Sequence, residues 1–213
     1  MTVAQRKERE KAARYNAIIR VAERLFFTRG YEAITMDDIA RESELSKGTL
    51  YTYFENKEDL YFSIVLHGVK IMNAMFKKAV KGKATGMARV YAIGVAFFEY
   101  YKKYPEHFKI FSYATSDRFE ARQCESAREI DRISRDNLNI LYDSIKAGID
   151  DGTIRPDIDP LKTSIFLIES SYSMLQLPMG LNKALEGFGM SQDELVFYSL
   201  DLLKRSIENG LGE

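Results

Sequence analysis

Apolar residues recur along most of the chain at intervals of three and four, the spacing of one face of an α-helix. Between residues 12 and 29 this stripe consists of Ile18, Ala22, Leu25 and Phe26. Gly30 follows, and glycine readily adopts the left-handed conformation that ends many helices. Similar stripes continue toward the C-terminus, and the 213 residues include only four prolines. The pattern predicts an all-α protein of about nine helices.

Three helix starts are predicted between residues 35 and 59, each from a side chain that can accept a backbone hydrogen bond. Thr35 has Asp38 three residues later, the spacing of a capping box. Ser46 precedes Lys47, and Asn56 precedes a long helix that we expect to reach residue 81. Starts this close together leave room only for short helices joined by tight turns.

Five further helices are predicted in the remaining chain. Their expected ranges are 87–103, 105–114, 118–150, 161–177 and about 191–209. Asp159 and Pro160 form a cap followed by a first-turn proline, and Ser191 with Glu194 repeats the capping spacing.

The composition limits the possible partners and locations. The chain has 31 basic and 31 acidic residues, which balance to zero, and a pI near 6.8. Any contact to nucleic acid must therefore come from a local basic surface. The charged start has no signal-peptide pattern, and no apolar run approaches the roughly 20 residues of a membrane span. We expect a cytoplasmic protein that does not enter the membrane.

In the segment "SKGTLYTYF", residues 46–54, most residue types favour β-strands, whereas the segments on both sides are predicted to be helical. On a helix, Leu50 and Phe54 would face the core. The outer face would then carry poor helix formers that hydrogen-bond and stack well. Short donor-rich side chains allow a helix to approach base edges in the major groove, which favours a DNA-binding function. The alternative is that the tyrosines pack on neighbouring helices and the lysines are solvated.

The segment "ITMDDIARESELSKGTLYTYFENKEDL", preceded by "RVAERLFFTRGY", resembles the DNA-binding domain of TetR-type transcriptional repressors. The resemblance implies an N-terminal three-helix helix-turn-helix domain over residues 1–55, with a basic arm at 1–13. It also implies a larger helical domain over residues 56–213 that binds an effector and forms a homodimer. The implied function is a ligand-responsive repressor, released from a palindromic double-stranded DNA operator by a small molecule.

Carried onto this chain, the resemblance and the hydroxyl-rich face imply the following DNA contacts: Thr35, Ser46, Lys47, Gly48, Thr49, Tyr51, Thr52, Tyr53 and Lys57. Glu44 occupies a turn position where the family usually has glycine, and a left-handed conformation there would cost about 1 kcal/mol. The basic arm either reaches the adjacent minor groove or is a solvated extension.

The larger domain is expected to bind a small hydrophobic or amphipathic effector of unknown identity, with no cofactor and no metal. The candidate pocket residues are His67, Phe97, Tyr101, Phe111, Glu169 and Tyr172. His107 is interpreted as a surface residue or a cap. Two apolar helices near the C-terminus are expected to pair across a two-fold axis. Their candidate interface residues are Ile165, Ile168, Leu175, Leu195, Tyr198 and Leu202.

An enzyme and a helical adaptor are the two alternative function classes. An enzyme is disfavoured because the chain has no nucleophile-elbow motif, no glycine-rich phosphate loop after a strand and no histidine pair with metal spacing. A helical adaptor that keeps the head without specific DNA binding is the second alternative. The neutral total charge and Glu44 are the features that favour it.

Overall fold

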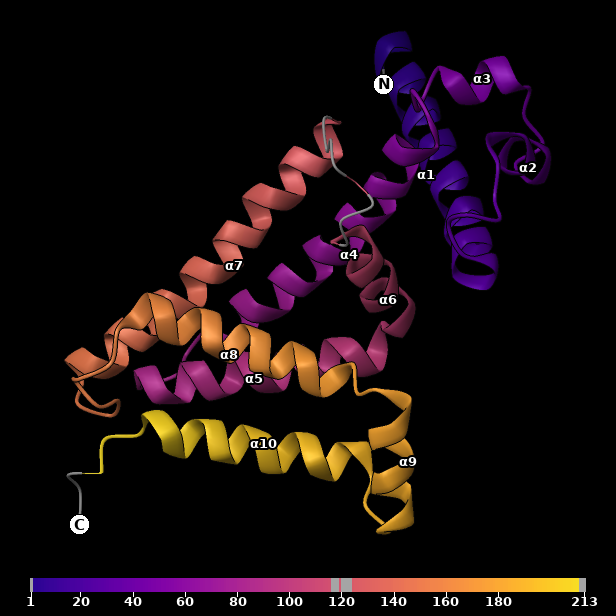
Figure 1. Cartoon of the computed structure of the whole chain (residues 1–213). Helices are drawn as coiled ribbons and strands as arrows, with labels where there is room; N and C mark the ends of the chain where they lie inside the picture. Colours follow the sequence, from indigo (N-terminus) through magenta and orange to yellow (C-terminus); the bar gives the residue numbers. More distant parts are fainter. Residues whose placement is uncertain (1, 116–118, 120–123, 211–213) are drawn as a thin grey trace. The chain divides into compact units, whose positions relative to one another are not determined.

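The computed structural model describes residues 2–115, 119 and 124–210, and these residues form ten α-helices and no strand (Figure 1). The predicted all-α fold is confirmed. Contacts divide the chain into two compact units. The first unit contains Met1–Val69 and Glu106–Arg132, and the second contains Lys70–Pro105 and Ile133–Glu213.

The first unit begins with α1 (Val3–Arg29), α2 (Met36–Glu42) and α3 (Lys47–Tyr51), which are followed by α4 (Lys57–Val80) and α6 (Pro105–Ala114). Helix α1 starts nine residues before the predicted residue 12, because Thr2 and Gln5 form a capping box. Residues 3–11 all remain exposed and present no apolar stripe, so periodicity does not reveal this first part of α1.

The core of the head, by which we mean α1 to α3, is built from the predicted apolar stripes. Helix α2 contacts both α1 and α3. Ile18, Ile39 and Leu50 have no solvent exposure, and Phe54 is also buried. The predicted pairing of Leu50 and Phe54 on the inner side is therefore confirmed, although α3 itself ends at Tyr51.

Side-chain caps fix where α2 and α4 begin. The Thr35 hydroxyl accepts from the Asp38 amide while the Asp38 carboxylate accepts from the Thr35 amide. The Asn56 side chain accepts from the Asp59 amide at 2.9 Å, as predicted for the start of α4. Because the caps satisfy amides that would otherwise be unpaired, even a helix as short as α2 can form.

A cluster of aromatic side chains fills the rest of the first unit. The Tyr61 hydroxyl donates to the Ile110 carbonyl at 3.0 Å, which joins α4 to α6. Tyr31 packs edge-on against Tyr61, with ring centroids 4.8 Å apart. Burial, with the carboxylates of Glu58 and Glu32 adding to it, raises the pKa of Tyr31 to about 12. These tyrosines are therefore structural groups that stay protonated at neutral pH.

The second unit is organised around α5 (Gly86–Lys103), α8 (Pro160–Leu175) and α10 (Gln192–Ile207), each of which contacts the other two. The C-terminal part of α4 and most of α7 (Glu125–Asp150) also belong to this unit. A β-carbon at Gly94 would lie 2.7 Å from Leu200 Cδ2, so this glycine allows α5 and α10 to pack closely. The residues following α7 are tied to the end of α10, because the Arg155 amide donates to the Ile207 carbonyl at 3.0 Å.

Helix α9 (Met179–Gly187) was not predicted, and it corrects the expected single connection between α8 and α10. None of its residues is buried, although Leu181, Ala184 and Leu185 recur at helical spacing. The predicted start of α7 at Arg118 lies outside the described residues. None of the described helices combines the length and apolar composition needed to cross a lipid bilayer.

Candidate nucleic-acid interface

Helix α3 presents a polar outer face over its single buried residue, Leu50. Ser46, Lys47, Gly48, Tyr51 and Thr52 are exposed, whereas Thr49 and Tyr53 are half-buried. The Tyr51 side chain has 51% of its surface exposed, and that of Lys47 has 63%. Helix α3 therefore offers hydroxyl, ammonium and phenol donors to an external partner.

Hydrogen bonds within this turn fix the positions of its hydroxyl groups. The Ser46 hydroxyl accepts from the Thr49 amide at 3.1 Å and lies 2.8 Å from the Thr49 hydroxyl. The Thr52 hydroxyl donates to the Thr49 carbonyl at 2.6 Å. These bonds hold the hydroxyl side chains close to the backbone, so these side chains project little from the outer face of α3.

Gly48 leaves the surface of α3 open. A β-carbon built at this position would have one neighbour within 4 Å, Ser46 Oγ at 3.9 Å, which is ordinary contact. Packing within the protein therefore does not require glycine here. Because glycine weakens a helix by about 1 kcal/mol relative to alanine, its presence is better explained by close approach of a partner.

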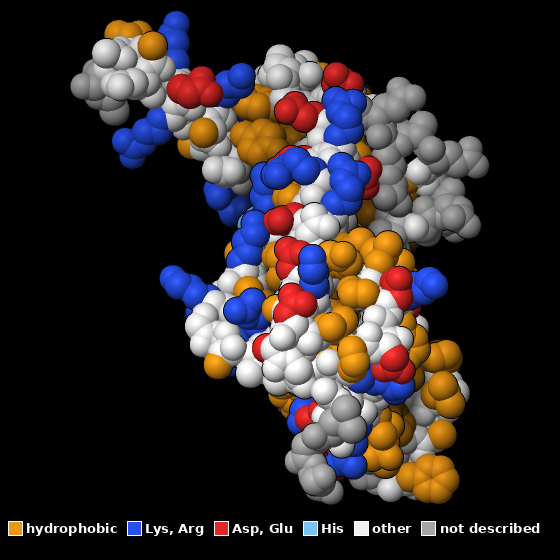
Figure 2. Space-filling view, turned by 90° about the vertical axis from the view of Figure 1, so that its left-hand side faces the viewer, with side chains coloured by type: hydrophobic (Ala, Val, Ile, Leu, Met, Phe, Trp, Pro, Cys, Tyr) orange, Lys and Arg blue, Asp and Glu red, His pale blue; other side chains and the backbone are white. Residues whose placement is uncertain are grey.

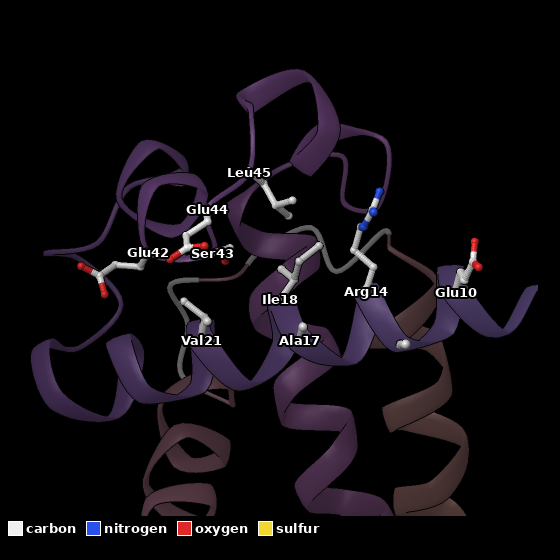
Figure 3. Close-up of a pocket in the computed structure, with 10 residues that line it drawn as sticks. Glu10, Arg14, Ala17, Ile18, Val21, Glu42, Ser43, Glu44 and Leu45 are labelled. Atoms are coloured by element: carbon white, nitrogen blue, oxygen red, sulfur yellow. The ribbon is translucent and has the colours of Figure 1, made fainter. Parts of the chain in front are cut away.

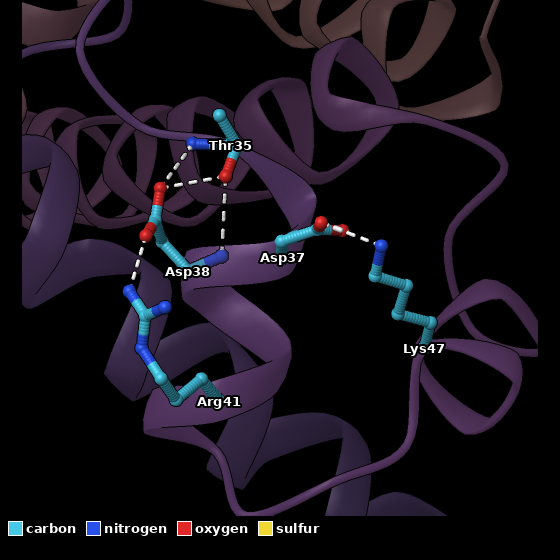
Figure 4. A network of polar contacts seen from close by, with 5 residues as sticks. All are labelled: Thr35, Asp37, Asp38, Arg41 and Lys47. Atoms are coloured by element: carbon cyan, nitrogen blue, oxygen red, sulfur yellow. Dashed lines mark hydrogen bonds and ion pairs between the residues drawn. The ribbon is translucent and has the colours of Figure 1, made fainter.

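A network of polar side chains links the start of α2 to the start of α3 (Figure 4). The Thr35 hydroxyl donates to the Asp38 carboxylate at 2.6 Å, and Arg41 also donates to Asp38. Lys47 Nζ lies 2.5 Å from the Asp37 carboxylate, and both side chains are more than half exposed. Two predicted phosphate-binding residues, Thr35 and Lys47, thus have carboxylate partners within the protein itself.

Lys57 is more deeply engaged than the sequence indicates. Its ammonium donates to the carbonyls of Tyr31 and Ile34, each at 3.0 Å, and lies 4.1 Å from the Tyr31 ring centroid. These contacts secure the loop between α1 and α2. A phosphate contact by Lys57 stays a prediction and would have to coexist with this structural function.

The turn between α2 and α3 has a residue in the left-handed region at the position where the resembled family usually has glycine. Glu44 has a φ of 54°, and it is the one non-glycine residue with positive φ in the described part of the chain. Beside this turn, a groove of about 490 Å³ separates α1 from the residues that follow α2 (Figure 3). Apolar side chains from α1, including Ile18 and Val21, face Leu45 across it. The groove lies entirely within the head, and no predicted effector-pocket residue lines it.

The chain was compared with known proteins. A family model described as "Bacterial regulatory proteins, tetR family" matches residues 18–64, the segment that contains most of the head. An uncharacterised helix-turn-helix regulator of Bacillus subtilis, YhgD, is 29% identical over 156 residues, covering 73% of this chain and 79% of that protein. A solved TetR/AcrR-family regulator from Thermobifida fusca is 27% identical, with a TM-score of 0.71 over 94% of this chain and all of that one.

The head of the chain belongs to the TetR family.

Two further relatives are described by fatty acid metabolism or by a bound acyl-CoA. The fatty acid metabolism regulator protein of Bacillus subtilis is 27% identical over 71% of this chain and 76% of its own length. A solved Bacillus subtilis FadR in complex with stearoyl-CoA has a TM-score of 0.68 at 21% identity, covering 89% of this chain and 97% of that one. At this identity the structural likeness concerns the fold.

The effector residues expected from the TetR resemblance fall in different units. His67 and Phe111 belong to the first unit. Phe97, Tyr101, Glu169 and Tyr172 belong to the second. Within the second unit, the Tyr101 hydroxyl donates to the Gln192 side chain at 3.3 Å, joining α5 to α10, and Glu169 is exposed. The assignment of these six residues to one pocket stays a prediction.

The expected interface residues of the TetR-family dimer are mostly on the surface. Ile165, Ile168, Tyr198 and Leu202 are exposed by 40–63%, and Leu195 is half-buried. Leu175 differs, because it is only 4% exposed and belongs to the core of its own unit. It therefore has little surface to offer a partner, and its place in the interface stays a prediction.

His107 is not the surface residue that was expected. Its side chain is 11% exposed, and it lies near Glu23 and His67. These three residues come from α1, α4 and α6, so no local spacing in the sequence marks them. Glu23 was not among the predicted site residues of this TetR-family chain.

Proposed function

We propose that the protein is a sequence-specific DNA-binding transcriptional repressor that acts as a homodimer and is released from a palindromic operator by a small-molecule effector. The observation that carries the proposal is the outer face of α3. It combines exposed Tyr51 and Lys47 with a glycine that packing does not require. A face of this kind suits contact with phosphates and base edges.

The hydroxyl groups around α3 support its use as the recognition helix. Ser46 and Thr49 lie in the first turn, the part of a recognition helix that approaches base edges. Tyr51 and Thr52 follow on the exposed side, where a phenol or hydroxyl can donate to phosphate oxygens. Thr35, Tyr53 and Lys57 complete the proposed contact set at the edges of this surface.

The exposed apolar side chains of α8 and α10 support dimerisation. Leu161, Ile165, Phe166 and Ile168 project from α8, and Phe197, Tyr198 and Leu202 project from α10. Figure 2 shows hydrophobic side chains gathered in the lower right of that view. Two such helices from each protomer can bury their apolar surface in a four-helix arrangement. A two-fold dimer would place two copies of α3 at half-sites about 34–36 Å apart.

The effector is proposed to bind to the larger helical domain, from residue 56 onward, and to favour a conformation with weaker operator affinity. Because coupling between two binding sites is reciprocal, operator DNA should weaken effector binding by the same factor. The relatives named for fatty acid metabolism and stearoyl-CoA make long-chain acyl-CoA thioesters the first probes to test. They do not fix the effector of this chain.

Sequence-specific DNA binding is tested by fluorescence anisotropy with a labelled duplex from just upstream of the protein's own gene. We expect tight binding that outcompetes random DNA and weakens steeply with salt. If that duplex binds no better than random DNA, selection from a random-sequence library follows. Failure to enrich any sequence would contradict the proposal and favour the adaptor alternative.

The test of regulation uses the same labelled operator with stearoyl-CoA and a shorter acyl-CoA as probes. A true effector should lower operator affinity, and saturating operator should lower affinity for that effector equally. Coenzyme A alone is the matched control for the nucleotide part of the ligand. An effector that binds equally well with and without operator would contradict this mechanism without affecting the assignment of α3.

A further inference from the structure

The two histidines of the chain meet at one carboxylate. His67 Nδ1 lies 3.1 Å from Glu23 Oε1, and His107 Nε2 lies 3.9 Å from the same oxygen. The three residues come from α4, α1 and α6, and all belong to the first unit. One potential ligand atom from each residue lies within 4.8 Å of the other two.

Neighbouring rings hold the imidazoles in place. The rings of His67 and His107 meet edge to face, with centroids 5.4 Å apart and an interplanar angle of 85°. His107 also meets Phe27 edge to face, at 5.2 Å and 82°. The His107 imidazole thus contacts both an apolar ring and the second imidazole, and its Nε2 lies 3.9 Å from Glu23.

Burial gives the cluster a closed side and an open side. The side chains of His107 and Glu23 are 11% and 16% exposed, whereas that of His67 is 55% exposed.

We propose that Glu23, His67 and His107 bind one divalent transition-metal ion of the Zn²⁺, Ni²⁺ or Co²⁺ type. Two imidazoles and one carboxylate suit these ions, whereas Mg²⁺ and Ca²⁺ prefer oxygen ligands alone. Metal–ligand distances of about 2.0–2.2 Å place neighbouring ligand atoms about 3.3–3.6 Å apart in a tetrahedron. The 3.1 Å separation is close to this range, and the 3.9 Å separation requires a shift of His107 by roughly half an ångström. The two histidine nitrogens, which lie within 4.8 Å of each other, must also come within this range.

The open side of the cluster leaves room for water or another ligand to complete the coordination. An ion at this position would join α1, the first helix of the head, to α4 and α6. Since α2 contacts α1, the ion would stabilise the unit that carries α3. Metal binding at this cluster would require neither the effector nor operator DNA.

The test is isothermal titration of tag-free, full-length protein with Zn²⁺, together with the visible absorption spectrum of the Co²⁺-loaded protein. We expect saturation at one ion per chain. The variants His67→Gln and Glu23→Gln should each weaken Zn²⁺ binding at least tenfold, because each removes a ligand. Cys124→Ser is the matched control, because Cys124 lies near Asp59 and Glu58 rather than in the cluster, and it should bind as the unaltered protein does.

A measurement on the unaltered protein guards against variants that fail to fold. With only two histidines, the chain has two sets of imidazole proton signals, which His67→Gln assigns. Both sets should shift on addition of Zn²⁺. The proposal is overturned if Zn²⁺ is not taken up saturably, or if uptake leaves both sets of histidine signals unchanged.

Discussion

The outer face of α3 and the outer faces of α8 and α10 are both exposed, yet they carry opposite chemistry. On α3 the exposed side chains include Ser46, Lys47 and Thr52, which donate hydrogen bonds. On α8 and α10 they include Phe166 and Phe197, at 54% and 47% exposure. Exposure alone therefore does not indicate what a surface contacts. A face rich in hydrogen-bond donors suits a polyanion, whereas a face with several exposed apolar side chains suits a second apolar surface.

The largest effect is expected from placing charge on the apolar face. The double variant Ile165→Glu with Leu202→Glu should weaken self-association at least 100-fold, because burying unpaired carboxylates at an interface costs about 3 kcal/mol or more. Sedimentation velocity measures the change, and operator affinity should fall with it. Tyr91→Glu, which places a charge at an exposed aromatic residue of α5, is the matched control. A double variant that remains a dimer would show that the partner surface lies elsewhere.

The next largest effect is expected on the polar face. Tyr51→Ala should weaken operator binding by roughly 10- to 100-fold, since each half-site loses a hydrogen-bonding or stacking group. The free energy of unfolding should change little, because half of this side chain already faces solvent. Anisotropy titration against operator and random duplexes measures the first quantity, and chemical denaturation the second. Unchanged operator affinity would contradict the assignment of α3.

The variant Gly48→Ala adds one methyl group, which should affect the stability of the head and operator binding in opposite directions. Alanine should stabilise the head by about 0.5–1 kcal/mol, because nothing in the protein obstructs a β-carbon there. The same methyl group should weaken operator binding about tenfold by holding α3 away from the base edges. The two effects have opposite signs, and denaturation and anisotropy report them separately. An alanine variant that gains stability and keeps operator affinity would show that close approach at Gly48 is not needed.

The smallest effect is expected at the cap of α2. Hydrogen bonds from Thr35, and then the nearby Arg41, lower the pKa of Asp38 below its ordinary value of 3.8. The ionised side chain therefore stabilises the fold above that ordinary pKa, and this contribution is lost as pH falls through the lowered value. The Tm of Asp38→Asn should lie below that of the unaltered protein at pH 7, and the difference should shrink in acid. A difference that is independent of pH would mean that the carboxylate charge does not contribute.

Local chemistry made the head predictable from the sequence. Thr35, Ser46 and Asn56 each accept the hydrogen bond that their helix start requires. Such features depend on neighbours within four residues, so they can be read along the chain.

Other features depend on surroundings that the sequence does not show. Helix α9 has no buried residue, so its short apolar repeat of Leu181, Ala184 and Leu185 does not mark a face that packs into the core. Leu175 has the same residue type as the exposed Leu202, and only packing places it in the core. Glu23, His67 and His107 converge through three helices, so their separation in sequence gives no indication of a cluster.

The ion pair between Lys47 and Asp37 has a consequence for the thermodynamics of association. In the free protein, this lysine already has an internal counterion in place of one from solution. When Lys47 exchanges Asp37 for a phosphate, a cation still leaves the DNA, but a carboxylate is left uncompensated and attracts a cation in turn. The net number of salt ions released should then be smaller than the number of phosphate contacts. The logarithm of operator affinity should accordingly fall with the logarithm of salt concentration less steeply than about 0.9 per contact.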